Sequence, residues 1–283
     1  MSEKIKEALF ATNAVRVCEA DHPFWYTSGK LGPFYINTHF LYGSEIEANQ
    51  LLTEIETAAA KDRLLFPAYI LDILLKQYET NGLYKMVIDV LIEKSKKEPV
   101  DFISGGERRD FFFSVLPAYF LKKPHLFIFK DSGAVYTDAN FQNTTHASEI
   151  DLKGLVSLHI VDLITEASSF IRAWIPVIKE LGAEMKSTLT VVDRLQGGMQ
   201  ILQNENVKGE SLVEIDPLLF EQAHKRGDIN EQQMRLVMDF ISNPDVFMPS
   251  FLAQHPKFIE QQLLLGGKNA ERARLAIEKG YAK

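Results

Sequence analysis

Between residues 100 and 198, short apolar runs alternate with helix-like stretches, and this alternation constrains the fold more than any other feature of the chain. The apolar runs stand at residues 100–103, 126–129, 155–161 and 188–192. Helical patterns at 111–121 and 168–181 follow the first and the third of them. Strands that alternate with helices predict an α/β fold with a mostly parallel sheet flanked by helices. Ligands of such sheets bind at the carboxyl ends of the strands.

The rest of the chain is mostly helical in pattern. Residues 3–18 predict one helix, and 23–42 predict two short extended pieces around a loop. Three helices are expected over about 44–96, where Ser44 and Glu47 have the spacing of a capping box. From about residue 200 onward we expect helices again. The predicted domains are therefore a core over 1–200, with a helical insertion at about 44–96, and a helical C-terminal extension over 201–283.

Charge and cysteine content exclude several classes of protein. The net charge of −7 argues against a protein that coats nucleic acid through a general basic field. The single cysteine, Cys18, cannot form an internal disulfide and is expected to be a small buried hydrophobe in a cytoplasmic protein. The N-terminus lacks a signal-peptide pattern, and no apolar run reaches the about 20 residues that span a bilayer. We expect neither nucleic-acid nor membrane partners.

Polar and small residues gather in three loops that follow predicted strands, at 104–110, 162–169 and 193–198. In the second of them a strand ends at an acid, Asp162, and a hydroxyl-rich loop leads into a helix. Backbone N–H groups at a helix start together with Ser and Thr hydroxyls form a phosphate-binding cradle. The alternative is that Ser168 caps the helix and Asp162 closes a turn.

Four segments, in the same order, resemble the type I phosphoribosyltransferases of the orotate phosphoribosyltransferase group. They are Phe24–Asn37 (FWYTSGKLGPFYIN), Asp101–Arg109 (DFISGGERR), Leu158–Ser169 (LHIVDLITEASS) and Val192–Gly198 (VDRLQGG). The resemblance extends over about residues 5 to 200. It implies a transferase that moves ribose 5-phosphate from phosphoribosyl pyrophosphate (PRPP) to a nucleobase such as orotate, in pyrimidine biosynthesis. It also implies Mg²⁺ as the cofactor bound with PRPP, and a homodimer.

The resemblance assigns roles residue by residue. Catalysis falls to Asp162, which would hold the ribose hydroxyls, and to Lys130. Phosphate binding falls to Thr165, Glu166, Ala167, Ser168, Ser169, Arg108 and Arg109, the two arginines facing the pyrophosphate. Base binding falls to Lys30, Phe34, Tyr35 and Arg194. The protein supplies no metal site of its own, although Asp162 would approach the Mg²⁺ of Mg-PRPP, and the histidines have no zinc-ligand spacing.

Several positions depart from the family pattern. Val161 stands where the family has the first of two adjacent acids, and Ala167 where it has a glycine of the phosphate loop, beside the acidic Glu166. Asp110 replaces a glycine at the end of the pyrophosphate loop, and the lysine and histidine expected after Lys130 are absent. These departures keep two alternatives open. One is a non-catalytic regulatory protein that binds PRPP or a nucleotide, and the other is an interaction module with a vestigial pocket.

Overall fold

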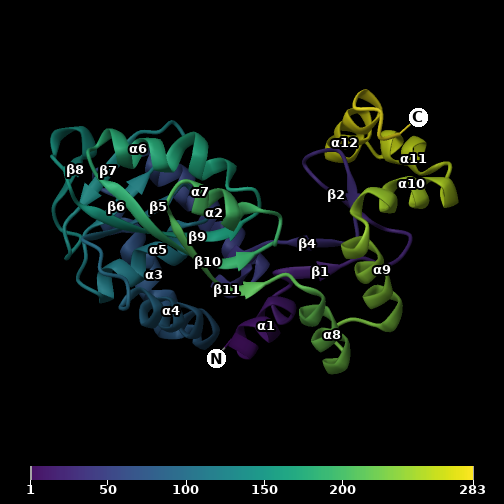
Figure 1. Ribbon diagram of the computed structural model, residues 1–283, viewed down its shortest axis with the longest axis horizontal. Coiled ribbons are helices and arrows are strands. Elements are labelled where there is room, and N and C mark those ends of the chain that lie inside the picture. Colours follow the sequence, from purple (N-terminus) through teal and green to yellow (C-terminus); the bar gives the residue numbers. More distant parts are fainter. Residues whose placement is uncertain (1, 283) are drawn as a thin grey trace. The chain divides into compact units, whose positions relative to one another are not determined.

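The computed structural model describes residues 2–282, which divide into two compact units, each built from two stretches of sequence. The first unit combines the chain up to residue 14 with residues 38–216, and the second combines residues 15–37 with the chain from 217 onward. The predicted boundary at residue 200 falls inside the first unit. The ribbon is coloured by sequence in Figure 1, where the second unit combines the purple residues 15–37 with the green to yellow residues from 217 onward.

The first unit is an α/β structure, as predicted. Its helices are α1 (Ser2–Ala11), α2 (Glu45–Lys61), α3 (Phe66–Thr80), α4 (Gly82–Ser95), α5 (Phe111–Phe120), α6 (Ile175–Glu180) and α7 (Gly198–Asn204). Its strands are β5 (Phe102–Gly106), β6 (His125–Ile128), β7 (Ala134–Thr137), β8 (Thr144–His146), β9 (Val156–Ile164), β10 (Glu184–Asp193) and β11 (Lys208–Glu214). A 3-10 helix at Thr38–Tyr42, another at Ala147–Glu149 and a π-helical turn at Phe170–Trp174 complete the unit.

These strands form one sheet in the order β11-β10-β9-β5-β6-β7-β8. The five strands from β11 to β6 are parallel, and only β7 and β8 run antiparallel at one edge. The mostly parallel sheet is therefore confirmed. The β7–β8 hairpin was not predicted, because its short strands lie in a connection rich in Asp, Asn and Thr.

The side chains of β6 show how both faces of the sheet are covered. Leu126 and Ile128 pack into the buried cluster that includes Ile175 and Ile178 of α6. Phe127 points to the other face, where its ring lies 5.1 Å from that of Phe111 in α5. Figure 1 shows α6 on one side of the sheet and α3 and α4 on the other. This alternation is the two-residue period of a strand buried on both faces.

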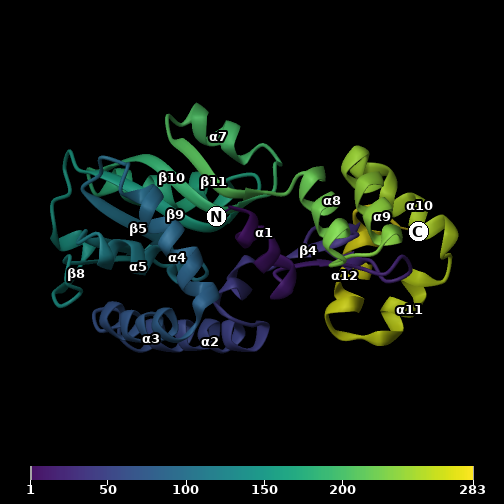
Figure 2. The ribbon, with the colours of Figure 1, turned by 90° about the horizontal axis from the view of Figure 1, so that it is seen from below.

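The three helices expected over about 44–96 are confirmed as α2, α3 and α4. The Ser44 hydroxyl caps α2 by accepting a hydrogen bond from the Glu47 N–H at 3.2 Å. Asn81 ends α3 and caps α4, since its side chain accepts from the Leu83 and Tyr84 N–H groups. The Tyr69 hydroxyl of α3 donates a hydrogen bond to Glu54 of α2 at 3.4 Å, and Figure 2 shows both helices along the lower edge of the view.

Two predicted helical stretches were wrong in part. The first helix ends at Ala11, and Val15–Val17 form a strand, β1, because β-branched residues at alternate positions pair well with the Phe34–Ile36 strand. Beyond residue 200, Lys208–Glu214 form the edge strand β11 beside β10. An edge strand rich in charged residues carries little apolar signal of its own.

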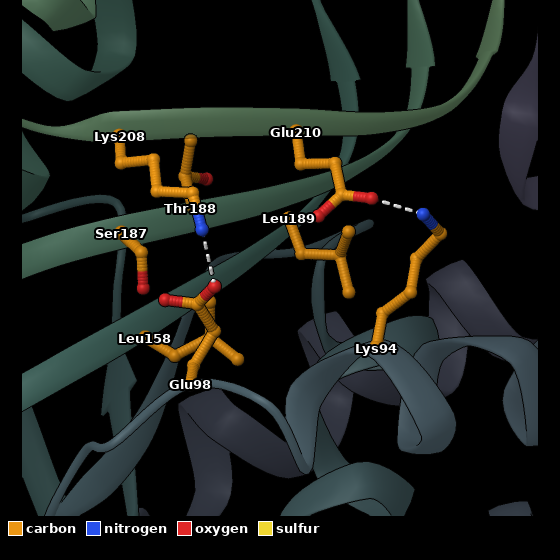
Figure 3. Close-up of a pocket in the computed structure, with 8 residues that line it drawn as sticks. All are labelled: Lys94, Glu98, Leu158, Ser187, Thr188, Leu189, Lys208 and Glu210. Atoms are coloured by element: carbon orange, nitrogen blue, oxygen red, sulfur yellow. Dashed lines mark hydrogen bonds and ion pairs between the residues drawn. The ribbon is translucent and has the colours of Figure 1, made fainter.

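Two ion pairs hold β11 against α4 and the segment that follows it (Figure 3). Lys94 of α4 pairs with Glu210, and Lys208 lies 2.8 Å from Glu98. They flank a cavity of about 10 Å³, which is room for one water molecule. The buried Ser187 hydroxyl lines this cavity, and it has no hydrogen-bond partner among the described residues.

The second unit is mainly helical. Its strands are β1 (Val15–Val17), β2 (Phe24–Trp25), β3 (Leu31–Gly32) and β4 (Phe34–Ile36), paired as β1 with β4 and β2 with β3. Its helices are α8 (Pro217–Arg226), α9 (Glu231–Ser242), α10 (Pro244–Gln254), α11 (Phe258–Leu265) and α12 (Gly267–Glu278). The two extended pieces predicted within 23–42 are confirmed, and Figure 1 shows β2 beside α12.

One sequence prediction about a single residue in this unit is also confirmed. Cys18 is buried, and burial raises the pKa of its thiol to about 12. Trp25 is a packing residue: its indole N–H donates to Gln262 at 3.0 Å, and its ring lies 5.9 Å from Phe258.

Over residues 2–282, no helix combines the length and apolar character needed to span a bilayer.

Candidate functional site

Four loops of the first unit lie at one edge of its sheet. They follow the carboxyl ends of the parallel neighbours β5, β6, β9 and β10, and comprise residues 107–110, 129–133, 165–169 and 194–198. The three loops expected from sequence to carry chemistry are among them, together with the turn that contains Lys130. This edge is where ligands bind in parallel α/β sheets.

The glycines at the end of β5 allow close packing beneath the first loop. A Cβ at Gly105 would lie 2.2 Å from the Ser114 hydroxyl, and a Cβ at Gly106 would lie 2.2 Å from the Trp174 indole nitrogen. The loop then turns, with a cis peptide bond between Glu107 and Arg108. Only glycine lets α5 and the π-helical turn approach the strand this closely.

Asp110 joins two of the loops. Its Oδ2 accepts a hydrogen bond from the Gly106 N–H and its Oδ1 accepts one from the Asp162 N–H, each at 3.1 Å. Burial, and then the nearby Asp162 carboxylate, raise the pKa of Asp110 well above its usual value. Asp110 is therefore a buried link between Gly106 of β5 and Asp162 of β9.

Asp162 lies at the end of β9 with one carboxylate oxygen available. Burial raises its pKa to about 6, against the lowering effect of the Arg109 guanidinium. Among the described residues its Oδ2 has no hydrogen-bond partner, although the residue is only 8% exposed. A buried acceptor without a partner is costly, which suits this carboxylate to a ligand hydroxyl.

Arg108 and Lys130 are already engaged by a carboxylate. Arg108 Nη1 lies 2.6 Å and Lys130 Nζ lies 2.9 Å from the same oxygen of Glu56, in α2. The Lys130 N–H also donates to Glu107 at 3.1 Å, and Lys130 Nζ lies 3.7 Å from the other oxygen of Glu107. The positive charge of Arg109, in contrast, acts on Asp162 and His39, and it lowers the pKa of both side chains.

The phosphate-loop candidate is an open turn after β9. Ala167 is buried in the left-handed region at φ 51°, the conformation that a glycine takes without strain. Glu166 and Ser168 are exposed, and Ser169, at the start of the helical segment, makes no side-chain cap. The helix-cap alternative for Ser168 therefore has no support in the described residues, because no hydrogen bond of its hydroxyl is found there.

The loop after β10 is pinned to the phosphate-loop candidate. The Arg194 N–H donates to the Ile164 carbonyl at 3.0 Å, and the Gly198 N–H donates to the Thr165 carbonyl at 2.9 Å. A Cβ at Gly198 would lie 2.6 Å from that carbonyl oxygen. The backbone of the Arg194 turn is thus held directly against Thr165.

The three other predicted base-binding residues belong to the second unit. Lys30 Nζ lies 3.0 Å from Asp245, and Phe34 is buried with its ring 5.2 Å from Phe220. Tyr35 is half-buried in β4, opposite Arg16. Their role toward a base therefore stays a prediction, as does that of Arg194.

Sequence reasoning missed two residues near the loops. His39 is buried in the 3-10 helix with its Nδ1 unpartnered among the described residues, and burial, Arg109 and Arg108 lower its pKa to about 3. The only sequence signal was the polar pair Thr38-His39 inside an apolar stretch. Glu56 gave no signal, because an acid on an exposed helix face is ordinary.

The residues present fit a magnesium ion that arrives with its substrate. No group of three or more His, Cys, Asp or Glu side chains within 2–282 is placed to hold a metal. Mg²⁺ commonly takes one or two carboxylates and completes its shell with substrate phosphates and water. The unpartnered oxygen of Asp162 matches that requirement.

The comparisons with known proteins agree with the architecture. No family model matches the chain. An orotate phosphoribosyltransferase of Saccharolobus solfataricus is 24% identical over 155 residues, which are 55% of this chain and 75% of the relative. UMP synthase of Leishmania donovani shares the fold with a TM-score of 0.58 at 18% identity, over 85% of this chain but only 42% of that one.

An orotate phosphoribosyltransferase from Aeropyrum pernix has a TM-score of 0.50 at 17% identity, over 77% of this chain and 98% of that one. The shared fold, the distant sequence relation and the loops gathered at one sheet edge all indicate similarity to the orotate phosphoribosyltransferases. The chain is therefore orotate phosphoribosyltransferase-like by distant sequence similarity, and it has the α/β fold of the solved orotate phosphoribosyltransferases.

Proposed function

We propose that the protein transfers ribose 5-phosphate from PRPP to a nucleobase such as orotate. The observation that supports this most is the gathering of loops 107–110, 165–169 and 194–198, with Lys130, at the carboxyl ends of neighbouring parallel strands. This edge offers backbone N–H groups, hydroxyls, cations and one unpartnered carboxylate oxygen within one unit.

In the proposed reaction, the bond between the sugar C1 and the pyrophosphate oxygen breaks and a bond from C1 to a ring nitrogen of the base forms. Thr165, Ser168 and Ser169 would bind the 5-phosphate, and Arg108 and Arg109 the departing pyrophosphate. Asp162 would accept hydrogen bonds from the ribose hydroxyls. Since the transition state is cation-like at the sugar, catalysis consists mostly of positioning and charge stabilisation.

Mg²⁺, when bound with PRPP, would neutralise part of the pyrophosphate charge, with Asp162 as the protein group that approaches it. Lys130 would add positive charge near the leaving group. Arg194 is proposed to contact the base, the base-binding role of Lys30, Phe34 and Tyr35 stays an expectation from the resemblance, and a homodimer is the proposed assembly.

A second candidate is a regulatory protein that binds PRPP or a nucleotide without turnover. One specific observation favours it: a single Glu56 oxygen pairs with both Arg108 and Lys130, two of the cations assigned to the pyrophosphate and to catalysis. Binding through Arg109 and the 165–169 loop would be retained in such a protein.

A thermal-shift titration with PRPP and Mg²⁺, followed by turnover assays with orotate and other bases, tests both candidates. Saturation at 100 times the dissociation constant stabilises a protein by about 2.7 kcal/mol. A transferase shows a shift and turnover, with Asp162→Asn impairing turnover in an intact fold and Arg194→Ala weakening base binding. Binding without turnover identifies the regulatory protein, and the absence of any shift contradicts both.

A further inference from the structure

The helical insertion contributes an anion to the candidate site. One oxygen of Glu56, in α2, lies 2.6 Å from Arg108 Nη1 and 2.9 Å from Lys130 Nζ. These two cations come from different loops, after β5 and after β6. A single carboxylate oxygen between two cations is the arrangement that a phosphate oxygen would take at the same place.

A second tie joins the same helix region to the same turn. Arg63, just after α2, donates to Asp131 at 2.8 Å, and its guanidinium lies 4.4 Å from the centre of the Phe129 ring. The turn that carries Lys130 is therefore attached to the insertion at two adjacent positions. Only the Glu56 tie also involves Arg108.

The Glu56 contacts are open to exchange with a dissolved anion. The side chains are 44% exposed for Glu56, 31% for Arg108 and 56% for Lys130. Ion pairs at this exposure are individually weak, because water screens them. A ligand with several negative charges competes well for the two cations, and its charge repels the carboxylate that it replaces.

We propose that Glu56 is a built-in competitor for the pyrophosphate group. It holds Arg108 and Lys130 in the ligand-free protein and is displaced when free pyrophosphate or the pyrophosphate of PRPP binds. The insertion is then part of the site and sets its affinity, rather than only adding surface. The choice of ligand rests on the proposed function.

The test is isothermal titration calorimetry of the full chain and of Glu56→Gln with magnesium pyrophosphate and, separately, with PRPP. Removing two exposed ion pairs of about 0.2–1 kcal/mol each from the free state predicts roughly two- to thirtyfold tighter pyrophosphate binding. Glu54→Gln is the matched control, with the same charge change two residues away on α2. Arg63→Gln breaks the second tie without freeing Arg108 or Lys130, so it is not expected to tighten pyrophosphate binding, and tightening equal to that of Glu56→Gln would overturn the competitor role.

The outcomes separate this proposal from the transferase function. Unchanged or weaker pyrophosphate binding by Glu56→Gln overturns the competitor role, even if the wild type turns over PRPP. Tighter binding by Glu56→Gln, with no turnover of any base by either protein, supports the competitor role and contradicts the transferase. Equal tightening by Glu54→Gln would mean a general charge effect and overturn the proposal. The absence of pyrophosphate binding by both wild type and Glu56→Gln overturns it as well.

Discussion

The carboxylate of Asp110 accepts a hydrogen bond from the backbone N–H of Asp162, at 3.1 Å, across the ends of β5 and β9. Two acids are thereby buried side by side at the edge of the sheet where the loops gather. Burial and the Asp162 charge raise the pKa of Asp110, and burial raises the pKa of Asp162 to about 6. The site therefore holds a proton at a pH where isolated carboxyl groups have lost theirs.

This pair predicts a stability that falls as pH rises. The folded state binds protons more tightly than the unfolded chain between the ordinary pKa of 3.8 and the raised value of about 6 for Asp162. The contribution is fully present below about pH 4 and is lost as the pH rises through about 6. Asp162→Asn should remove about 1–3 kcal/mol of the difference in unfolding free energy between low and neutral pH, and so flatten the slope. Urea unfolding at pH 4 to 8 measures it, with the exposed Asp72→Asn as control. An unaltered slope in Asp162→Asn would contradict the assignment.

The charge on Arg109 is expected to control the ionisation of Asp162. Because the guanidinium lowers the pKa of that carboxyl, Arg109→Gln should raise the pKa above about 6, and Arg109→Lys should restore part of the difference. Carbon-detected NMR titration of the carboxyl measures the change. Arg108→Gln is the control, since Arg108 pairs with Glu56. Equal pKa shifts in both variants would mean that the two arginines act only through net charge.

The left-handed conformation of Ala167 predicts different tolerance to glycine and valine. Replacing Ala167 by glycine relieves about 1–2 kcal/mol of backbone strain in the folded state. It also removes a buried methyl group that contributes about 0.8 kcal/mol, and it raises the conformational entropy of the unfolded chain. Ala167→Gly should therefore leave the unfolding free energy within about 1 kcal/mol of wild type. Ala167→Val should destabilise by more than about 2 kcal/mol, because a β-branched residue resists φ 51°. Thermal and chemical unfolding measure the stability of both variants. An unfolding free energy of Ala167→Val equal to that of wild type would show that the loop adopts another conformation.

The close contact between Gly106 and Trp174 predicts that a side chain added at residue 106 lowers the free energy of unfolding. A Cβ at residue 106 would lie 2.2 Å from the indole nitrogen, so Gly106→Ala should destabilise the fold by about 1–3 kcal/mol. Combining it with Trp174→Phe, which removes the clashing atoms, should recover part of the loss. Gly82→Ala is the matched control, since nothing lies within 4 Å of its added Cβ and α4 starts there. A double mutant cycle by urea unfolding measures the coupling, and additive losses would contradict it.

The sequence by itself determined the α/β core. Short apolar runs typical of buried strands alternate with stretches that have the 3.6-residue hydrophobic period of a helix. It also located the loops at 104–110, 162–169 and 193–198, since small and polar residues directly follow buried strands. The capped helices of the insertion were predictable for the same local reason: Ser44 and Asn81 stand next to the helix ends that they cap.

Only the tertiary structure decided which residues of distant segments meet. Val15–Val17 and Lys208–Glu214 became strands because partners far along the chain lie beside them, namely Phe34–Ile36 and β10. Glu56 and Asp110 acquired their roles in the same way, one by lying between Arg108 and Lys130, the other by burial against Asp162. Periodicity reports which face of an element is buried, whereas burial of a charge and its partner depend on packing between elements, which local sequence does not encode.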